Sequence, residues 1–226
     1  MNYCASYIFL AGASQGVGRE IAERLAAQQM KLKALLRTDA AQAPLEAMGI
    51  KVVLGDALNI EDVERAMLGE EPIYAVISTI GGLPKDREKA DYLGNKNLID
   101  AAVKARVQKF ILVSSIGSGN SVIALPPQAL ETLKPVLVEK EQAEKHLIES
   151  GLTYTIVRPG GLKSEPATGN GVLTEDPRVA GTIHRADVAQ LVCSCLTSDR
   201  ANNKILSAVD RQMMYGQPEF EELILN

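Results

Sequence analysis

Three closely spaced glycines, Gly12, Gly16 and Gly18, constrain the fold of this chain more than any other feature of its sequence. They lie between an apolar run, residues 7–11, and a segment, residues 17–29, whose apolar side chains recur at helical spacing. The pattern predicts a β-strand, a tight glycine turn and an α-helix in succession. Such a turn leaves backbone N–H groups at the helix N-terminus free to bind an anion. The alternative is a connection in which glycine serves only the backbone conformation.

Short apolar runs continue to alternate with helical segments along the chain. Strands are predicted at residues 7–11, 31–37, 51–54, 75–80, 110–114, 153–158 and 204–209. Helices are predicted at residues 17–29, 95–105, 137–150 and 185–196. The strands of the first half are expected to be buried, because their apolar runs are nearly continuous. The alternation is typical of right-handed βαβ units and predicts an α/β fold with a single doubly wound parallel sheet of the Rossmann type.

One domain is expected to span residues 1–226, because no Pro/Gly/Ser linker and no internal repeat divides the chain. Residues 162–181 are predicted to be loop-rich. A small C-terminal extension, residues 160–226, is expected to build a substrate pocket against the sheet. Whether residues 162–181 close over a ligand as a lid is left open by the sequence.

Charge and composition exclude several classes of function. The formal net charge is −4 and no Lys/Arg cluster is longer than a pair, so neither nucleic acid nor a membrane is an expected partner. No apolar stretch approaches the roughly 20 residues needed to span a bilayer. Cys4, Cys193 and Cys195 are odd in number and lack metal-ligand spacing, which indicates reduced thiols and no metal site. We expect a cytoplasmic monomer or weak homodimer that binds a small molecule.

The glycine-rich turn also carries specific expectations for a dinucleotide. Gly12 would make the tight turn, Gly16 would let N–H groups approach a pyrophosphate, and Gly18 would let the helix pack closely on the strand. A dinucleotide is therefore expected to contact the whole turn, which consists of Gly12, Ala13, Ser14, Gln15, Gly16, Val17 and Gly18.

Residues 12–19 resemble the turn of short-chain dehydrogenases/reductases, with the GxxxGxG spacing of their Tyr-Lys members. The rest of the chain resembles an atypical branch of that superfamily, which holds NmrA-like proteins and the biliverdin reductase B/flavin reductase family. The resemblance covers nearly the whole chain and rests on residues 53–57 (VLGDA), 97–102 (NLIDAA), 110–115 (FILVSS) and 150–160 (SGLTYTIVRPG). Gln15 is a departure, because that branch usually has a GxxGxxG turn.

The end of the second predicted strand indicates which dinucleotide binds. An NAD enzyme usually presents an acidic residue there to the ribose 2′-hydroxyl, whereas an NADP enzyme offers a cation to the 2′-phosphate. Arg37 stands at this position, and its planar guanidinium suits phosphate oxygens. This favours NADP(H) as the cofactor. Two alternatives remain: Asp39 serves a ribose hydroxyl instead, or Arg37 is only a solvated charge.

Further candidates for cofactor contacts follow the other strands. The resemblance implies that Asp56 and Ala57 lie beside the adenine; alternatively, Asp56 caps the following turn or helix. Ile80, Gly81 and Gly82 would permit close backbone approach to the nicotinamide-side ribose, unless the glycine pair makes only a flexible turn. The remaining candidates are Ser114, Lys140, Pro159, Gly160 and Gly161.

Of the tyrosine and lysine that the Tyr-Lys enzymes use, this chain has only the lysine. Those enzymes use a tyrosine four residues before a lysine as general acid. Lys140 is suitably placed, but Val136 stands four residues before it, and no tyrosine occurs between Tyr92 and Tyr154. Alcohol–ketone chemistry by that mechanism is therefore not expected, and Lys140 is a candidate for binding a cofactor ribose. A solvated helix face is expected to hold Glu139, Lys140, Glu141, Glu144 and Lys145.

Two serines end the fifth predicted strand, at the edge where ligands bind in open α/β sheets. The resemblance to biliverdin reductase B implies that Ser115 assists reduction and that Ser114 is its polar neighbour. The alternative is that both hydroxyls bond only local backbone. Ser115, Ser114 and Lys140 are thus the candidate catalytic residues.

Histidines contribute little to this prediction. The histidine that the family has after the sixth strand is replaced by Gly161. His146 is expected to be a solvated or packing residue. His184 precedes a helix start that resembles the family's helix near the pocket, and both a site role and a structural role with capping by Asp187 stay open.

Together these residues predict an NADPH-dependent reductase of a planar conjugated acceptor, such as a flavin, a quinone or a biliverdin-like tetrapyrrole. Hydride transfer to such an acceptor needs an exposed nicotinamide face, with protons available from water. The alternative is a non-catalytic NADP(H)-binding protein that senses redox state or assists assembly, as NmrA-like proteins do. Sugar epimerisation, a third possibility, again requires the Tyr-Lys pair.

Overall fold

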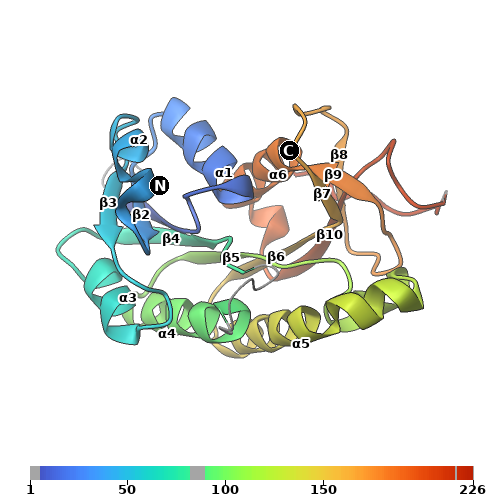
Figure 1. Ribbon diagram of the computed structural model, residues 1–226, viewed down its shortest axis with the longest axis horizontal. Helices are drawn as coiled ribbons and strands as arrows, with labels where there is room; N and C mark the ends of the chain where they lie inside the picture. The colour runs from blue at the N-terminus through green and yellow to red at the C-terminus, as the bar shows by residue number, and fades with distance from the viewer. Residues whose placement is uncertain (1–5, 82–89, 217, 226) are drawn as a thin grey trace.

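The computed structural model describes residues 6–81, 90–216 and 218–225. Cys4 and Gly82, which the sequence singled out, lie outside these ranges. The described chain forms an eight-stranded sheet with helices on both faces, so the α/β, Rossmann-type prediction is confirmed (Figure 1).

The central sheet is almost entirely parallel. Its strands, in spatial order, are β3 (Lys51–Leu54), β2 (Leu32–Leu36), β1 (Tyr7–Ala11), β4 (Ile73–Ser78), β5 (Lys109–Val113), β6 (Tyr154–Pro159), β10 (Lys204–Asp210) and β8 (Gly171–Thr174). Neighbours pair in parallel except β8, which runs antiparallel to β10. All seven predicted strands are present, with ends displaced by at most two residues.

Burial follows from position in the sheet. Strands β2 and β5, which have a neighbouring strand on each side, are buried along their whole length. The expectation that every strand of the first half is buried is wrong for β3, where Lys51 and Leu54 are exposed. Strand β3 forms the sheet edge and has only β2 as a neighbour, which leaves all of its residues at least partly open to solvent.

Helices cover both faces of the sheet. Figure 1 shows α1 (Gly16–Ala27), α2 (Gln42–Glu46) and α6 (Arg185–Thr197) on one face, and α3 (Ile60–Met67), α4 (Asn95–Ala105) and α5 (Pro127–Glu149) on the other. Each layer encloses its own buried apolar cluster. The described ranges also contain four short helical segments: η2 (Asp39–Ala41), η3 (Ala90–Gly94), η4 (Gly119–Ala124) and η5 (Asp199–Ala201).

Helix α6 runs in the same direction as α1. The ammonium of Lys109, at the start of β5, donates to the carbonyl oxygens of Cys195 (2.5 Å) and Ser198 (2.9 Å). The C-terminal end of α6 therefore lies at the amino edge of the sheet, and burial there lowers the pKa of Lys109. The N-terminus of α6 consequently lies at the carboxyl edge, where α1 also begins.

The segment predicted to be loop-rich, residues 162–181, contains two short strands. It includes most of β7 (Gly161–Lys163) and all of β8, and β7 pairs in parallel with β9 (Thr182–His184) in a separate two-stranded sheet. Most of the segment has no regular structure, as expected. The sequence did not predict the short strands within it, because they are stabilised by partners elsewhere in the chain, which sequence propensity does not record.

Helix α5 begins well before the predicted start at residue 137. Pro127 occupies its first turn, where proline is tolerated because the missing N–H group would have no helical partner. Pro135 lies inside the helix and does not end it, although proline is a common helix breaker. The long α5 therefore carries Val136, Lys140 and Glu144 on one continuous element.

The described ranges contain no helix that is long and apolar enough to cross a membrane. In the same ranges, no group of three or more His, Cys, Asp or Glu side chains is arranged to hold a metal ion. Cys193 and Cys195 are free thiols buried in α6. Burial raises the pKa of Cys193 to about 11 and that of Cys195 to about 12, so both are neutral packing groups at physiological pH.

Candidate functional site

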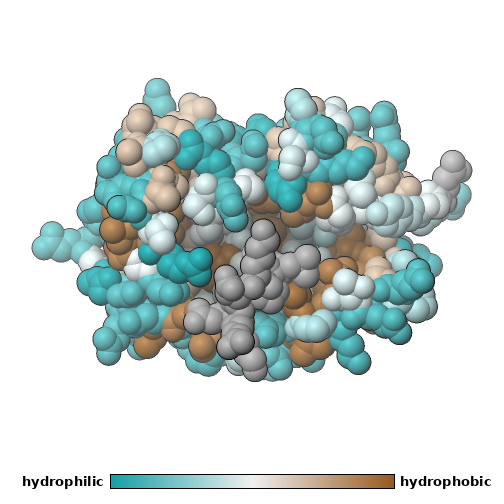
Figure 2. Space-filling view, viewed as in Figure 1, coloured by the Kyte–Doolittle hydropathy of each residue, from teal (hydrophilic) through white to brown (hydrophobic). Residues whose placement is uncertain are grey.

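The strand order places a crevice at the carboxyl edge of the sheet. From β1 the chain builds β2 and β3 on one side, then crosses to β4, β5 and β6 on the other. Ligands of open α/β sheets bind at this switch point, where successive loops diverge. The residues predicted at strand ends thus share one edge. In Figure 2, outside the atoms drawn in grey, hydrophilic residues cover most of the visible face and apolar residues form separate small groups.

The glycine-rich turn is too tightly packed for a side chain at two of its glycines. Gly12 has a φ of +94°, and a Cβ atom there would lie 2.4 Å from Thr79 Oγ1. A Cβ atom at Gly18 would lie 2.1 Å from the carbonyl oxygen of Gly12, so the expected close approach of helix and strand is present. The Thr79 hydroxyl lies 3.1 Å from the carbonyl oxygen of Ala11 and 3.3 Å from that of Gly12. Thr79, which the sequence analysis missed, thereby fixes the turn from β4.

The turn leaves backbone N–H groups open at the start of α1. Gly16 has a φ of +57°, and a Cβ atom there would have only the Arg185 side chain within 4 Å. Ala13 and Val17 are buried in the core and can offer a ligand only their backbone. The exposed residues of the turn are Ser14 and Gln15. Because the first turn of α1 also lacks an acidic residue, this cradle fits the pyrophosphate of a dinucleotide.

The end of β2 carries the cation expected to select the cofactor. Arg37 is exposed directly after Leu36. Within the described ranges its guanidinium has no hydrogen bond or ion pair. Asp39, at the start of η2, is exposed as well. The Arg37 side chain is therefore available to a phosphate group at this corner of the crevice.

Asp56 makes the turn that follows β3. Its carboxylate accepts a hydrogen bond from the N–H group of Leu58 (2.9 Å), and its own N–H group donates to Asp62 (3.0 Å). The N-cap of α3 is Asn59, whose side chain accepts from Glu61. Asp56 thus stabilises the turn and does not cap the helix.

Ala57 and Ile80, which follow β3 and β4, both pack close to Gly94 of η3. A Cβ atom at Gly94 would lie 2.8 Å from the side chain of Ile80 and 3.5 Å from that of Ala57. The carbonyl oxygen of Ala57 also accepts a hydrogen bond from Asn97 of α4 (2.9 Å). These contacts hold the two candidate residues at one side of the crevice.

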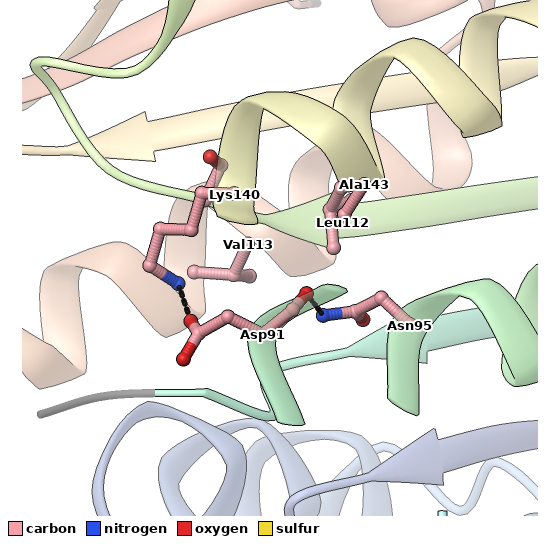
Figure 3. A pocket seen from close by; sticks show the side chains of 7 residues that line it. Asp91, Asn95, Leu112, Val113, Lys140 and Ala143 are labelled. Carbon is pink, nitrogen blue, oxygen red and sulfur yellow. Dashed lines mark hydrogen bonds and ion pairs between the residues drawn. The ribbon is translucent and has the colours of Figure 1, made fainter. Parts of the chain in front are cut away.

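Lys140 reaches the end of β4 from α5. Its ammonium lies 2.8 Å from the Asp91 carboxylate, with both side chains largely buried (Figure 3). A Cβ atom at Gly81, whose φ is +127°, would lie 3.1 Å from the Lys140 nitrogen. Asn95 supports this pair, because its amide donates to the Asp91 carbonyl (2.7 Å) and accepts from the Ser78 hydroxyl (2.6 Å). Lys140 therefore lies where a nicotinamide-side ribose is expected, and Asp91 is a residue that the sequence analysis missed.

Ser114 contributes its hydroxyl to a buried network between the sheet and α5. The hydroxyl donates to the Glu144 carboxylate, which also accepts from Arg158 Nε (3.0 Å) and Nη2 (2.6 Å). Arg158 Nη1 donates to Asn120 (2.6 Å). The expectation that Glu144 lies on a solvated helix face is wrong, because its pairing with Arg158 of β6 holds it in the core. The Ser114 hydroxyl is consequently already used in this network and is not open to a ligand.

Ser115 is the half-buried member of the serine pair. Its hydroxyl donates to the neighbouring carbonyl oxygen of Ile116 (3.0 Å), which is the local bond foreseen as the alternative. Within the described ranges this hydroxyl has no hydrogen bond to another side chain. Ser115 thus remains the serine available to the crevice.

The backbone of the turn after β6 is hydrogen-bonded to other segments of the chain. The N–H group of Gly160 donates to Ala208 and that of Gly161 to Gly181, both at 2.9 Å. A Cβ atom at Gly160 would lie 2.2 Å from the carbonyl oxygen of Gly181. The carbonyl oxygen of Pro159 accepts from Ile116 (3.0 Å). These glycines therefore join β6 to the small β7–β9 sheet, and their N–H groups are already used.

The buried His184 lies between two acidic side chains. Its Nε2 is 3.5 Å from Glu165 and its Nδ1, which has no hydrogen bond in the described ranges, is 3.8 Å from Asp187. Asp187 does not cap α6. Its carboxylate accepts from the N–H groups of Thr168 and Gly169, both at 2.9 Å, and so ties that segment to the helix.

Two other charges of α5, Lys145 and Glu141, lie on its solvated face, as expected. Lys145 pairs with Glu141 (2.7 Å), and His146 Nε2 lies 2.7 Å from Asp100 of α4. His146 therefore serves the contact between two helices.

A hollow of about 250 Å³ lies along β6 and β10 on the side of α5. It is lined by Asn120, Tyr154, Arg158, Glu175, Pro177, Asn203, Ile205 and Ser207. Strands β4 and β5 separate this hollow from β1 and its glycine-rich turn.

Comparison with curated proteins finds relatives that match most of this chain. An uncharacterized chloroplastic protein of Arabidopsis thaliana is 36% identical, over 90% of this chain and 76% of its own length. The uncharacterized sugar epimerase YhfK of Bacillus subtilis is 33% identical, over 87% and 91%. Sanguinarine reductase of Eschscholzia californica is 27% identical, over 87% and 86%. Because one of these relatives is chloroplastic, the cytoplasmic location stays a prediction.

Among solved structures, ChuY of Escherichia coli O157:H7, described as an anaerobillin reductase, has the same fold. The TM-score is 0.84 and the sequence identity 32%, over 93% of this chain and 100% of ChuY. With reductases among its relatives, this chain is oxidoreductase-like.

One family covers both the glycine-rich turn and helix α6. The NAD(P)H-binding family matches residues 12–199, from Gly12 through the start of η5. This match agrees with the pyrophosphate cradle at α1 and with the resemblance found in the sequence. The chain therefore belongs to the NAD(P)H-binding family and binds a nicotinamide cofactor.

Proposed function

We propose that this protein is an NADPH-dependent reductase of a planar conjugated acceptor, such as a flavin, a quinone or a biliverdin-like tetrapyrrole. The observation that carries the proposal is Val136. It is half-buried on α5, one helical turn before Lys140, where a Tyr-Lys enzyme has its general acid.

The chemistry of the acceptor follows from that missing acid. When bound, the nicotinamide supplies a hydride. Valine has no proton to give, and the Lys140 ammonium is held by Asp91. Reduction of an isolated ketone needs a positioned acid, whereas a conjugated acceptor spreads the new electron pair over its ring system and takes its proton from water. The site therefore suits conjugated acceptors better than simple ketones.

Two similarities support a reductase. ChuY is described as an anaerobillin reductase, and the Eschscholzia californica relative is named sanguinarine reductase. The name of YhfK suggests epimerisation instead. Epimerisation by the extended relatives again calls for a Tyr-Lys pair, and Val136 removes half of it.

The preference for NADPH rests on Arg37. Its exposed guanidinium follows β2, the strand beside the glycine-rich turn, and faces no competing partner in the described ranges. A charge-assisted bond to the 2′-phosphate would be absent with NADH. Arg37→Met should therefore weaken NADPH binding by about 10- to 100-fold and leave NADH binding unchanged. Equal NADPH affinity of the variant and the wild type would refute the role of Arg37.

Steady-state oxidation of NADPH tests the reductase itself. Purified protein is mixed with NADPH and, separately, with FMN, a soluble quinone and biliverdin, and the absorbance at the NADPH band is followed. Oxidation well above the protein-free rate with at least one acceptor is expected. Tight NADPH binding without turnover on any acceptor would favour the non-catalytic, redox-sensing alternative.

A further inference from the structure

Two helices begin side by side at the carboxyl edge of the sheet. The first residue of α6, Arg185, lies over the turn that starts α1. A Cβ atom at Gly16 would be 3.7 Å from Arg185 Nε and 3.8 Å from its Cδ. Both helix N-termini carry the positive end of a helix dipole, so their proximity concentrates positive potential at this point.

The charge of Arg185 adds to that potential and is not neutralised. Its Nη1 donates to the Ser164 hydroxyl (2.7 Å), a neutral partner. Arg185 forms no ion pair within the described ranges. The acidic residue of the same helical turn, Asp187, is buried and uses its carboxylate on the N–H groups of Thr168 and Gly169.

We propose that Arg185 binds the pyrophosphate of the dinucleotide from the side of α6. The inference rests on the cofactor site at Gly12–Gly18 and adds a residue that the turn itself does not contain. A guanidinium has five N–H donors, and the bond to Ser164 uses one of them. Within the part of the chain that the structure describes, the others have no partner, so they can bind phosphate oxygens brought to the N-terminus of α1.

Arg185 and Arg37 would then bind different phosphates of the same molecule. Arg37 follows β2, on the side of β1 that leads to the sheet edge, whereas Arg185 stands over the start of α1. The 2′-phosphate is expected at the first position and the pyrophosphate at the second. This separation can be tested with ligands that carry only one of the two groups.

The test is a binding matrix of variants and ligands. Wild type, Arg185→Met and Arg37→Met are titrated by calorimetry with NADPH, NADH, ADP-ribose and adenosine 2′-monophosphate. Arg185→Met should weaken NADPH, NADH and ADP-ribose alike, by about 10- to 100-fold, and leave adenosine 2′-monophosphate unchanged. Arg37→Met should weaken binding of the two ligands with a 2′-phosphate, NADPH and adenosine 2′-monophosphate. It should leave NADH and ADP-ribose unchanged.

Two controls keep the test specific. Arg178→Met removes an exposed arginine that pairs with Asp176 outside the glycine-rich turn, and it should change no affinity. Arg185→Lys keeps the positive charge but not the planar set of guanidinium donors. It should bind ADP-ribose more tightly than Arg185→Met and less tightly than the wild type. Thermal unfolding of each variant shows whether the fold is intact.

The proposal is overturned if Arg185→Met binds ADP-ribose within about threefold of wild type. It is also overturned if adenosine 2′-monophosphate is weakened as much as ADP-ribose, because the effect would then not be specific to the pyrophosphate. A protein that binds all ligands as expected but reduces no acceptor would refute the proposed reductase and leave the assignment of Arg185 standing.

Discussion

The Lys140 ammonium and the Asp91 carboxylate lie 2.8 Å apart, beside Gly81, three residues after the end of β4. Helix α5 thus places one cation at the carboxyl edge of the sheet, and η3 supplies the carboxylate that holds it. By the spacing of the Tyr-Lys enzymes, Lys140 takes the expected lysine position and Val136 the tyrosine position. The pair is suited to binding a ribose and not to donating a proton.

Lys140→Met should therefore weaken NADPH binding by about 10-fold or more, because a charged donor to the ribose is lost. The measurement is a fluorescence titration with NADPH. Lys145→Met is the matched control, since Lys145 is an exposed lysine on the same helix that pairs with Glu141. Equal affinities for the two variants would contradict the assignment of Lys140.

The buried pair of Glu144 and Arg158 predicts a large and non-additive effect on stability. Glu144→Gln leaves the Arg158 guanidinium buried without a counter-charge, which should cost about 3–5 kcal/mol of unfolding free energy. The double variant with Arg158→Met should recover part of that loss, because no uncompensated charge remains. Urea denaturation measures both values, and the exposed Glu141→Gln is the control. Additive losses would show that the two residues are not coupled.

The glycine-rich turn predicts a steric effect that depends on position. At Gly18 a Cβ atom would lie 2.1 Å from a carbonyl oxygen, so Gly18→Ala should destabilise the fold by about 1–3 kcal/mol and abolish cofactor binding. At Gly69 a Cβ atom would meet its nearest neighbour at 3.7 Å, so Gly69→Ala should be neutral in both respects. Thermal unfolding and NADPH titration measure the two effects. A Gly18→Ala protein with wild-type affinity would contradict the packing described here.

The buried thiol of Cys195 predicts a loss of stability at alkaline pH. Burial raises its pKa from the ordinary value of 9.0 to about 12 in the folded protein, so the unfolded chain releases the proton first. The stabilisation is complete below pH 9 and is lost as the pH rises from 9 towards 12, with a slope approaching about 1.4 kcal/mol per pH unit.

Cys195→Ala should consequently lose less stability than the wild type between pH 9 and 10.5, as measured by urea denaturation at each pH. Ser194→Ala, a neighbouring substitution without an ionisable group, should follow the wild type. Parallel curves for Cys195→Ala and the wild type would show that this thiol is accessible in the folded state.

Much of the fold could be predicted because short-range sequence patterns determine its strands, helices and turns. Near-continuous apolar runs identified the parallel strands, and glycines between a strand and a helix identified the turn at Gly12. The small β7–β9 sheet escaped because strands of three residues carry no periodicity of their own. They pair because the fold brings Gly160 and Gly181, which precede the two strands, into contact.

The candidate site could be predicted only where a residue's role follows from its position along the chain. Arg37 and Gly81 were found because they follow strands. Thr79, Asp91 and Arg185 were not assigned a role, because their contacts are with residues far away in the sequence. Glu144 was misplaced for the same reason, since its spacing on α5 resembles a solvated face and only Arg158 of β6 explains its burial.

Amide hydrogen exchange with and without NADPH tests most directly that the predicted strand ends form one cofactor site. Saturating NADPH should slow exchange in peptides that cover Gly12–Gly18 and the ends of β2, β3 and β4. Exchange at the far edge strand β8 should be unchanged, because β8 lies at the opposite end of the sheet from β3. Bound NADPH that leaves the glycine-rich turn unprotected, or that protects only β8 and β10, would contradict the account.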